Sequence, residues 1–153
     1  MKKRNCCVPI CKHVRLHDCN QGTTIGLSDA GTRISVICSQ NDKVEIYRPD
    51  SCDTLTSCGM RVAACDFALR KITHPDYECV LIELKSGSWS FTEVRKQFEG
   101  GFQTLKSLGV SHKPTGLYVA SQKSANGSTQ ALGGLQTYKG LPIKRIALKL
   151  EWS

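Results

Sequence analysis

Residues 78–86, ECVLIELKS, form an apolar run that ends in two charged side chains, Glu83 and Lys85. Residues 61–70, RVAACDFALR, come before them across turn-forming residues around Pro75. Both stretches are rich in apolar residues and bounded by turn chemistry, so each predicts a strand. Together they indicate a hairpin, and the rest of the fold is built outward from it.

One pairing register suits both faces of this hairpin. If Asp66 lies opposite Glu83, the other face is uniformly apolar. Its predicted pairs are Cys65 with Leu84, Phe67 with Ile82, and Leu69 with Val80. We therefore expect these six residues to be buried together and the two carboxylates to share the opposite face.

Two adjacent carboxylates on one sheet face predict a cation site. Their Cβ atoms would lie about 5 Å apart, where like charges destabilise a sheet unless something compensates. Mg²⁺ prefers such oxygen ligands. Lys85 projects to the same face as Glu83, because strand side chains alternate. Its ammonium group would orient an attacking water and offset the charge on a phosphate.

A helix follows this strand. Ser90 and Glu93 form a capping box, and Gly109 occupies a C-terminal cap position. Apolar residues recur between them at helical spacing: Phe91, Val94, Phe98, Phe102, Leu105 and Leu108. Gly100 and Gly101 within this helix indicate close packing on the sheet.

The remaining segments predict an α/β domain on a mixed sheet. Residues 1–32 are expected to be an arm or irregular cap, and residues 33–153 a single domain. Within that domain, residues 33–38 and 43–48 suggest a hairpin, and residues 115–120 a further strand. The last strand is expected over residues 143–152, with Ile146, Leu148, Leu150 and Trp152 facing inward.

The pattern of Asp66, then Glu83-Leu84-Lys85 on the next strand, then Gln97 on the following helix resembles the PD-(D/E)XK nuclease core. The resemblance covers about residues 61–108. It implies a restriction-endonuclease-like fold, a mixed central sheet with flanking helices, and hydrolysis of phosphodiester bonds with Mg²⁺ or Mn²⁺. The protein would act on DNA in preference to RNA, as an endonuclease or exonuclease.

Carried over residue by residue, the resemblance makes Asp66 and Glu83 metal ligands and Lys85 the group that orients water. Gln97 lies at the edge of the buried helix stripe, where its amide would hold Lys85 or a water. Residues 1–32 contain no Glu that could serve as a further ligand, which leaves Glu45 as the candidate for a third acid.

The balance of charge favours a polyanionic partner. The chain has 21 Lys and Arg against 13 Asp and Glu, a formal net charge of +8, and excess positive charge binds phosphate through counterion release. Expected nucleic-acid contacts are Arg61, Arg70, Lys71, Trp89, Arg95 and Lys96. One small domain supplies little area to grip a duplex, so a homodimer or a partner protein is also expected.

The cysteines and the hydropathy pattern suggest a cytoplasmic protein. No apolar run resembles a secretory signal or reaches membrane-spanning length, so the nine cysteines are interpreted as reduced thiols and no membrane contact is expected. A structural Zn²⁺ ion on Cys7, Cys11, His13 and His17 is an alternative use of the N-terminal cluster. Two rival functions remain: a non-catalytic module of the same fold that binds nucleic acid or a protein, and a small zinc-binding adaptor.

Overall fold

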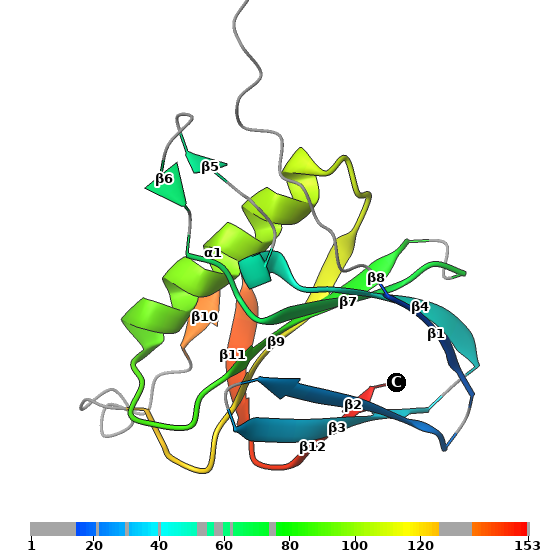
Figure 1. Ribbon diagram of the computed structural model, residues 1–153, viewed down its shortest axis with the longest axis horizontal. Coiled ribbons are helices and arrows are strands. Elements are labelled where there is room, and N and C mark those ends of the chain that lie inside the picture. Colours follow the sequence, from blue (N-terminus) through cyan, green and yellow to red (C-terminus); the bar gives the residue numbers. More distant parts are fainter. Residues whose placement is uncertain are drawn as a thin grey trace, which may run out of the picture.

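The computed structural model describes residues 15–20, 22–29, 31–39, 41–51, 55–56, 60–61, 63–73, 76–125 and 136–152 (Figure 1). Its elements are β1 (Arg15–Cys19), β2 (Thr24–Asp29), β3 (Thr32–Cys38), β4 (Asp42–Tyr47), the 3₁₀ helix η1 (Pro49–Ser51), β5 (Leu55–Thr56), β6 (Met60–Arg61), β7 (Phe67–Lys71), β8 (Glu78–Leu84), α1 (Phe91–Ser107), β9 (Lys113–Ala120), β10 (Thr137–Tyr138), β11 (Leu141–Ile146) and β12 (Lys149–Trp152).

The strands form one large sheet and two small ones. The large sheet has the order β1-β4-β7-β8-β9-β11-β10, and its pairs are antiparallel except for β8 with β9 and β9 with β11. A three-stranded sheet has the order β12-β3-β2, and β5 pairs with β6 alone. The expected α/β class with a mixed sheet is confirmed, although strands predominate and α1 is the one α-helix of the described residues.

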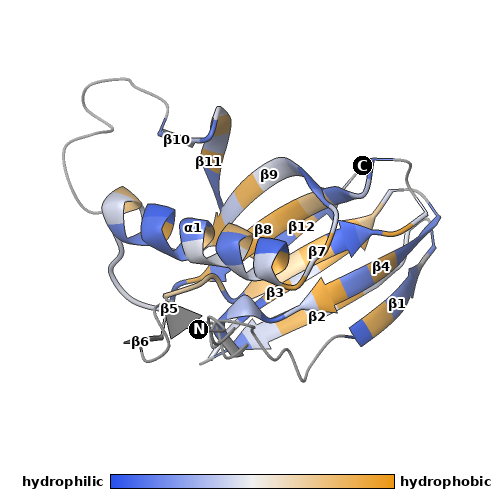
Figure 2. Cartoon of the chain, turned by 90° about the horizontal axis from the view of Figure 1, so that it is seen from above, coloured by the Kyte–Doolittle hydropathy of each residue, from blue (hydrophilic) through white to orange (hydrophobic). Residues whose placement is uncertain are grey.

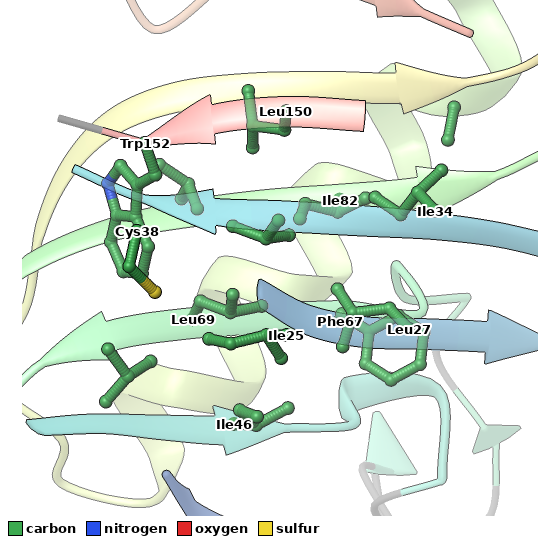
Figure 3. Close-up of a cluster of buried hydrophobic side chains, with 14 of the residues drawn as sticks. Ile25, Leu27, Ile34, Cys38, Ile46, Phe67, Leu69, Ile82, Leu150 and Trp152 are labelled. Atoms are coloured by element: carbon green, nitrogen blue, oxygen red, sulfur yellow. The ribbon is translucent and has the colours of Figure 1, made fainter. Parts of the chain in front are cut away.

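The large sheet lies between α1 and the three-stranded sheet (Figures 1 and 2). On one face, apolar residues of β7 and β8 join those of α1, including Ala68, Leu81 and Phe98. On the other face, Phe67 and Leu69 pack with Ile25 and Leu27 from the three-stranded sheet (Figure 3). Because β7 and β8 are covered on both faces, nearly all their side chains are buried.

The predicted register of β7 and β8 is confirmed. Phe67 pairs with Ile82, and Leu69 pairs with Val80. The expected apolar face is buried at these four positions and at Leu84. Cys65 is the exception, because it lies before β7 begins and packs with the helix-side cluster instead.

The helix α1 begins and ends as its capping residues predict. The Ser90 hydroxyl accepts a hydrogen bond from the Glu93 amide at 3.2 Å. At the other end Gly109 adopts a φ of +71°, a left-handed conformation that glycine adopts without strain. Gly100 and Gly101 are buried against residues 63–65 and Leu81, so the predicted close packing is confirmed.

Two expectations about the outer strands are wrong. Residues 15–19 and 24–29 are not an irregular arm: they form β1, which pairs with β4, and β2, which pairs with β3. The strands near residues 33–38 and 43–48 do not form a hairpin, because β3 and β4 belong to different sheets. Each finds a more extensive partner elsewhere, β3 between β2 and β12, and β4 between β1 and β7.

The expected last strand is also divided. β11 ends at Ile146 and pairs with β9, whereas β12 starts at Lys149 and pairs with β3 of the other sheet. The chain crosses between sheets at residues 147–148, so Leu148 is 65% exposed and does not face inward as expected. Leu150 and Trp152 are buried as expected.

The cysteine side chains that the structure describes are of two kinds. Cys38 is disulfide-bonded, so the expectation of reduced thiols throughout is wrong at this position. Cys65 and Cys79 are free and buried. Among the described residues, no helix combines the length and the apolar composition that crossing a membrane requires.

We predict that Gly100→Ala destabilises the protein by about 2–3 kcal/mol through overpacking. An added Cβ would lie 1.7 Å from the Ala63 carbonyl oxygen, which belongs to the backbone and cannot rotate away. Urea denaturation measures the change. Gly87→Ala is the matched control, because nothing lies within 4 Å of its added Cβ, and it should change stability by less than about 0.5 kcal/mol. A Gly100→Ala variant as stable as the wild type would contradict this packing.

Candidate metal centre

Asp66 and Glu83 lie side by side at the end of the β7–β8 pair. Asp66 immediately precedes β7, and its Oδ2 accepts a hydrogen bond from the Leu84 amide at 2.8 Å. Glu83 belongs to β8 and continues the β7–β8 register opposite Asp66. The two carboxyl groups are close enough for a hydrogen bond to contribute to the pKa of each. Sequence reasoning therefore predicted this pair correctly.

Both carboxyl groups are buried, unlike the charged side chains of a strand face that is exposed to solvent. Asp66 is 6% exposed and Glu83 is 3% exposed. Glu83 Oε2 is buried and has no hydrogen-bond partner in the described part of the chain. A buried oxygen without a partner is costly, and a divalent cation is a partner that would satisfy it. The hard oxygen donors of this pair fit Mg²⁺ or Mn²⁺.

Asp50 extends the acidic cluster from the neighbouring η1. One ligand oxygen each of Asp29, Asp50 and Asp66 lie within 4.8 Å of one another. The negative charge of Asp50 also raises the pKa of Glu83, after the larger effects of burial and of Asp66. Asp29 Oδ1 also lies 3.2 Å from the Arg48 guanidinium. Asp50 contributes to the raised pKa of Asp66 as well as to that of Glu83, so it acts on both members of the pair and is the third acid that we consider.

Sequence reasoning missed Asp50 and Asp29. The available signal for Asp50 was its Pro49-Asp50 dipeptide, in the η1 turn that follows β4. Asp29 is the last residue of β2 in the three-stranded sheet, so its position near Asp66 depends on how the two sheets pack. Glu45, the predicted third acid, is not near Asp66: its carboxylate binds Arg70 at 3.1 Å, further along β7.

The electrostatics of the pair favour a bound proton when no cation is present. Burial raises the pKa of Asp66 to about 7, although the Leu84 amide opposes the shift. The pKa of Glu83 is raised to about 9, mainly by burial and next by the neighbouring Asp66 carboxyl, whereas Lys85 lowers it. A divalent cation would take the place of this proton, because metal-ligating carboxylates must be ionised.

Lys85 lies between the acidic pair and the start of α1. Its Nζ is 3.7 Å from Glu83 Oε1 and 2.6 Å from Glu93 Oε1. The backbone supports this position, because the Lys85 amide donates to the Ala120 carbonyl at 2.9 Å. The ammonium group is therefore held beside Glu83 by a carboxylate from the helix, a contact that sequence reasoning did not include.

Gln97 lies one helical turn after Glu93. Its backbone carbonyl accepts a hydrogen bond from the Cys65 amide at 2.8 Å, which ties the middle of α1 to the residue before Asp66. Its side-chain Oε1 is buried without a hydrogen-bond partner in the described residues. The helix backbone thus contacts the segment that carries Asp66, and the position of the Gln97 amide beside Lys85 stays a prediction.

The predicted nucleic-acid contacts do not gather at this centre. Arg70 and Lys71 lie at the other end of β7 from Asp66, paired with Glu45 and Glu78. Trp89 is a core residue at 2% exposure, and its indole N–H donates to the Lys123 carbonyl. The others are dispersed: Arg95 hydrogen-bonds Thr137 and Gln136, Lys96 is exposed, and the Arg61 side chain lies outside the described residues.

Most of the predicted zinc ligands lie outside the residues that the structure describes. Cys7, Cys11 and His13 are not among the described residues. His17 is half-buried in β1, opposite Val44 of β4. The zinc site stays a prediction from the sequence.

Comparison of the chain with protein-family models, with curated proteins and with solved structures found no match. The resemblance of Asp66, Glu83, Lys85 and Gln97 to a nuclease pattern therefore depends on these residues and on their geometry.

We predict that the metal-free protein loses stability as pH rises from about 5 to about 8. The pKa values of Asp66 and Glu83, about 7 and about 9, exceed the unfolded values of about 4. Within this window the folded state holds more protons, so raising the pH lowers the free energy of unfolding. Thermal melting in EDTA measures the trend. Asp66→Asn/Glu83→Gln should flatten it, and an equally steep trend in that variant would contradict the assignment.

Proposed function

We propose that this protein is a Mg²⁺- or Mn²⁺-dependent nuclease that hydrolyses phosphodiester bonds, in DNA in preference to RNA. The observation that carries the proposal is the buried pair Asp66 and Glu83, with an unpartnered Glu83 oxygen and Lys85 Nζ 3.7 Å from the same carboxyl group. If both were ionised, two adjacent buried carboxylates would repel each other. A bound divalent cation would relieve this repulsion and satisfy the unpartnered Glu83 oxygen.

The arrangement supports a restriction-endonuclease-like core. An Asp directly before one strand and Glu-x-Lys at the end of its antiparallel neighbour lie at one end of the large sheet, and Gln97 belongs to the helix that follows. These are the positions of the PD-(D/E)XK pattern that the sequence resembles. The burial of both acids also argues against their being ordinary surface residues.

Asp66, Glu83 and Asp50 would hold the cation. Each supplies hard carboxylate oxygen, and Mg²⁺ typically uses one or two carboxylates together with waters and substrate phosphate oxygens. Once bound, the cation would supply Lewis-acid polarisation of a phosphate and a lowered pKa for a water. Asp29 stays with Arg48, which offsets part of the negative charge of the cluster.

Lys85 would position the nucleophile. Glu93 and Glu83 hold its ammonium group on two sides, so its Nζ–H groups have a fixed direction. From there it would donate a hydrogen bond to an attacking water or to a phosphate oxygen that gains charge. The unsatisfied Gln97 amide would accept a hydrogen bond from that water.

The proposed function also concerns where the enzyme acts and whether it acts as a monomer. We propose that the protein acts in the cytoplasm, where a disulfide such as that of Cys38 is uncommon. We also propose either self-association or a partner protein that enlarges the contact with a duplex. Size-exclusion chromatography with and without DNA separates these arrangements from a monomer acting alone.

We predict that Glu83→Gln and Lys85→Met each reduce Mg²⁺-dependent cleavage at least about 100-fold, because they remove a metal ligand and the water-positioning cation. The assay compares linear, circular and single-stranded DNA, and RNA, with Mg²⁺ and with EDTA. Lys106→Met is the matched control, since Lys106 is exposed in the last turn of α1. Wild-type binding without cleavage of any substrate would favour the non-catalytic module instead.

We predict that Glu93→Ala lowers kcat by about tenfold with little change in KM, because it frees the Lys85 ammonium group. Glu93→Gln should recover part of this loss, since its amide oxygen can still accept the hydrogen bond from Lys85. Neither variant removes the Ser90 cap, whose partner is the backbone amide of Glu93. Equal loss in both variants, accompanied by a lower melting temperature, would indicate a structural role for this contact.

A further inference from the structure

The carboxyl ends of β8, β9 and β11 meet at one edge of the large sheet. These strands are parallel to one another, and the segment that follows β8 leads into the start of α1 at the same edge. In α/β proteins, ligands bind preferentially outside the carboxyl ends of parallel strands. The candidate metal centre occupies the part of this edge that belongs to β8, which leaves the ends of β9 and β11 beside it.

The strand register puts Arg145 level with Glu83. Glu83 pairs with Val119 of β9, and Val119 pairs with Arg145 of β11. Two strand spacings therefore separate Arg145 from Glu83, about 10 Å between backbones. Ile143, two residues before Arg145, packs in the helix-side cluster. The Arg145 side chain therefore leaves the sheet on the same face as the acidic pair.

The Arg145 guanidinium is held at the strand ends by the backbone. Its Nη1 donates to the Ser121 carbonyl at 3.0 Å, just beyond β9. Ser121 is itself buried, and its hydroxyl accepts from the Lys123 amide at 3.1 Å. The Trp89 indole then fixes the Lys123 carbonyl at 2.9 Å. The Arg145 guanidinium and the Lys123 backbone are in this way anchored next to the segment that follows Lys85.

Neither of these two cations is neutralised by an acid among the described residues. Both side chains are exposed, and no ion pair with Asp or Glu involves them in that part of the chain. Arg70, Lys71 and Lys85 differ, because each pairs with a carboxylate. A guanidinium carries five N–H donors, so after its bond to Ser121 it still offers donors to a phosphate.

We propose that Arg145 and Lys123 form a phosphate-binding track that grips the backbone of a nucleic-acid strand as it leaves the metal centre. The inference deepens the proposed nuclease function and rests on it. The acidic centre alone repels a polyanion, so free positive charge within two strand spacings compensates for that repulsion. Contacts to phosphate position a substrate without reading its sequence, and the track therefore sets affinity and placement but not base preference.

The test measures binding without chemistry. Fluorescence anisotropy of a fluorescein-labelled 20-base-pair duplex is recorded in EDTA over a series of salt concentrations. The variants are Arg145→Gln, which keeps a donor for the Ser121 carbonyl, and Lys123→Gln. Lys106→Gln is the control, matched in lost charge and exposed in the last turn of α1. Thermal melting of each variant establishes that the fold is intact.

We expect Arg145→Gln and Lys123→Gln each to weaken binding roughly three- to tenfold and to lower the salt slope by about one, while Lys106→Gln changes binding less than about twofold. Equal losses in all three variants, or no loss at Arg145, would overturn the track. Cleavage with Mg²⁺ is scored separately. If the enzyme cleaves DNA and Arg145→Gln does not weaken binding, the track is refuted but the nuclease is not. If Arg145→Gln weakens binding and the wild type cleaves no substrate, the nuclease is refuted and a phosphate-binding surface is left.

Discussion

The pairing of β7 with β8 is the interaction on which both layers of this protein depend. One face of the pair, with Phe67 and Ile82, packs against the three-stranded sheet, and the other face, with Ala68 and Leu81, packs against α1. A slip of one residue would exchange these faces and turn Glu83 toward the core between the sheets. The apolar side chains on both faces therefore hold the register, and the register holds the carboxyl pair in place.

This constraint explains why the acidic centre lies where it does. Along β8 every position before Glu83 contributes to a core or to an ion pair with Lys71. Polar groups are tolerated at the end of the strand pair, where the chain leaves the sheet toward α1. Even there the burial of Asp66 and Glu83 is only partly offset by the Leu84 amide and by Lys85. Local departures from good packing chemistry of this kind are typical of functional sites.

The helix α1 completes the centre because it packs unusually close to the sheet. Gly100 and Gly101 have no side chains, and the helix backbone approaches residues 63–65 directly. This approach lets the Gln97 carbonyl bond the Cys65 amide. The capped first turn meanwhile points Glu93 at Lys85. Packing, capping and candidate chemistry therefore use the same helix, and a bulkier helix face would separate α1 from the acidic pair.

The sequence by itself determined the local features: the β7–β8 register, the capped helix with its buried glycines, and the grouping of Asp66, Glu83 and Lys85. These follow from alternation and helical spacing, which act over a few residues or across one turn. Only the tertiary structure decided which sheets receive β3, β4 and β12, and that Asp50 and Asp29 join the centre. Alternating strands fit several partners equally well, and the choice depends on which faces and edges the whole chain can bury together. That competition involves the entire molecule, so its outcome cannot be predicted from any single stretch of sequence.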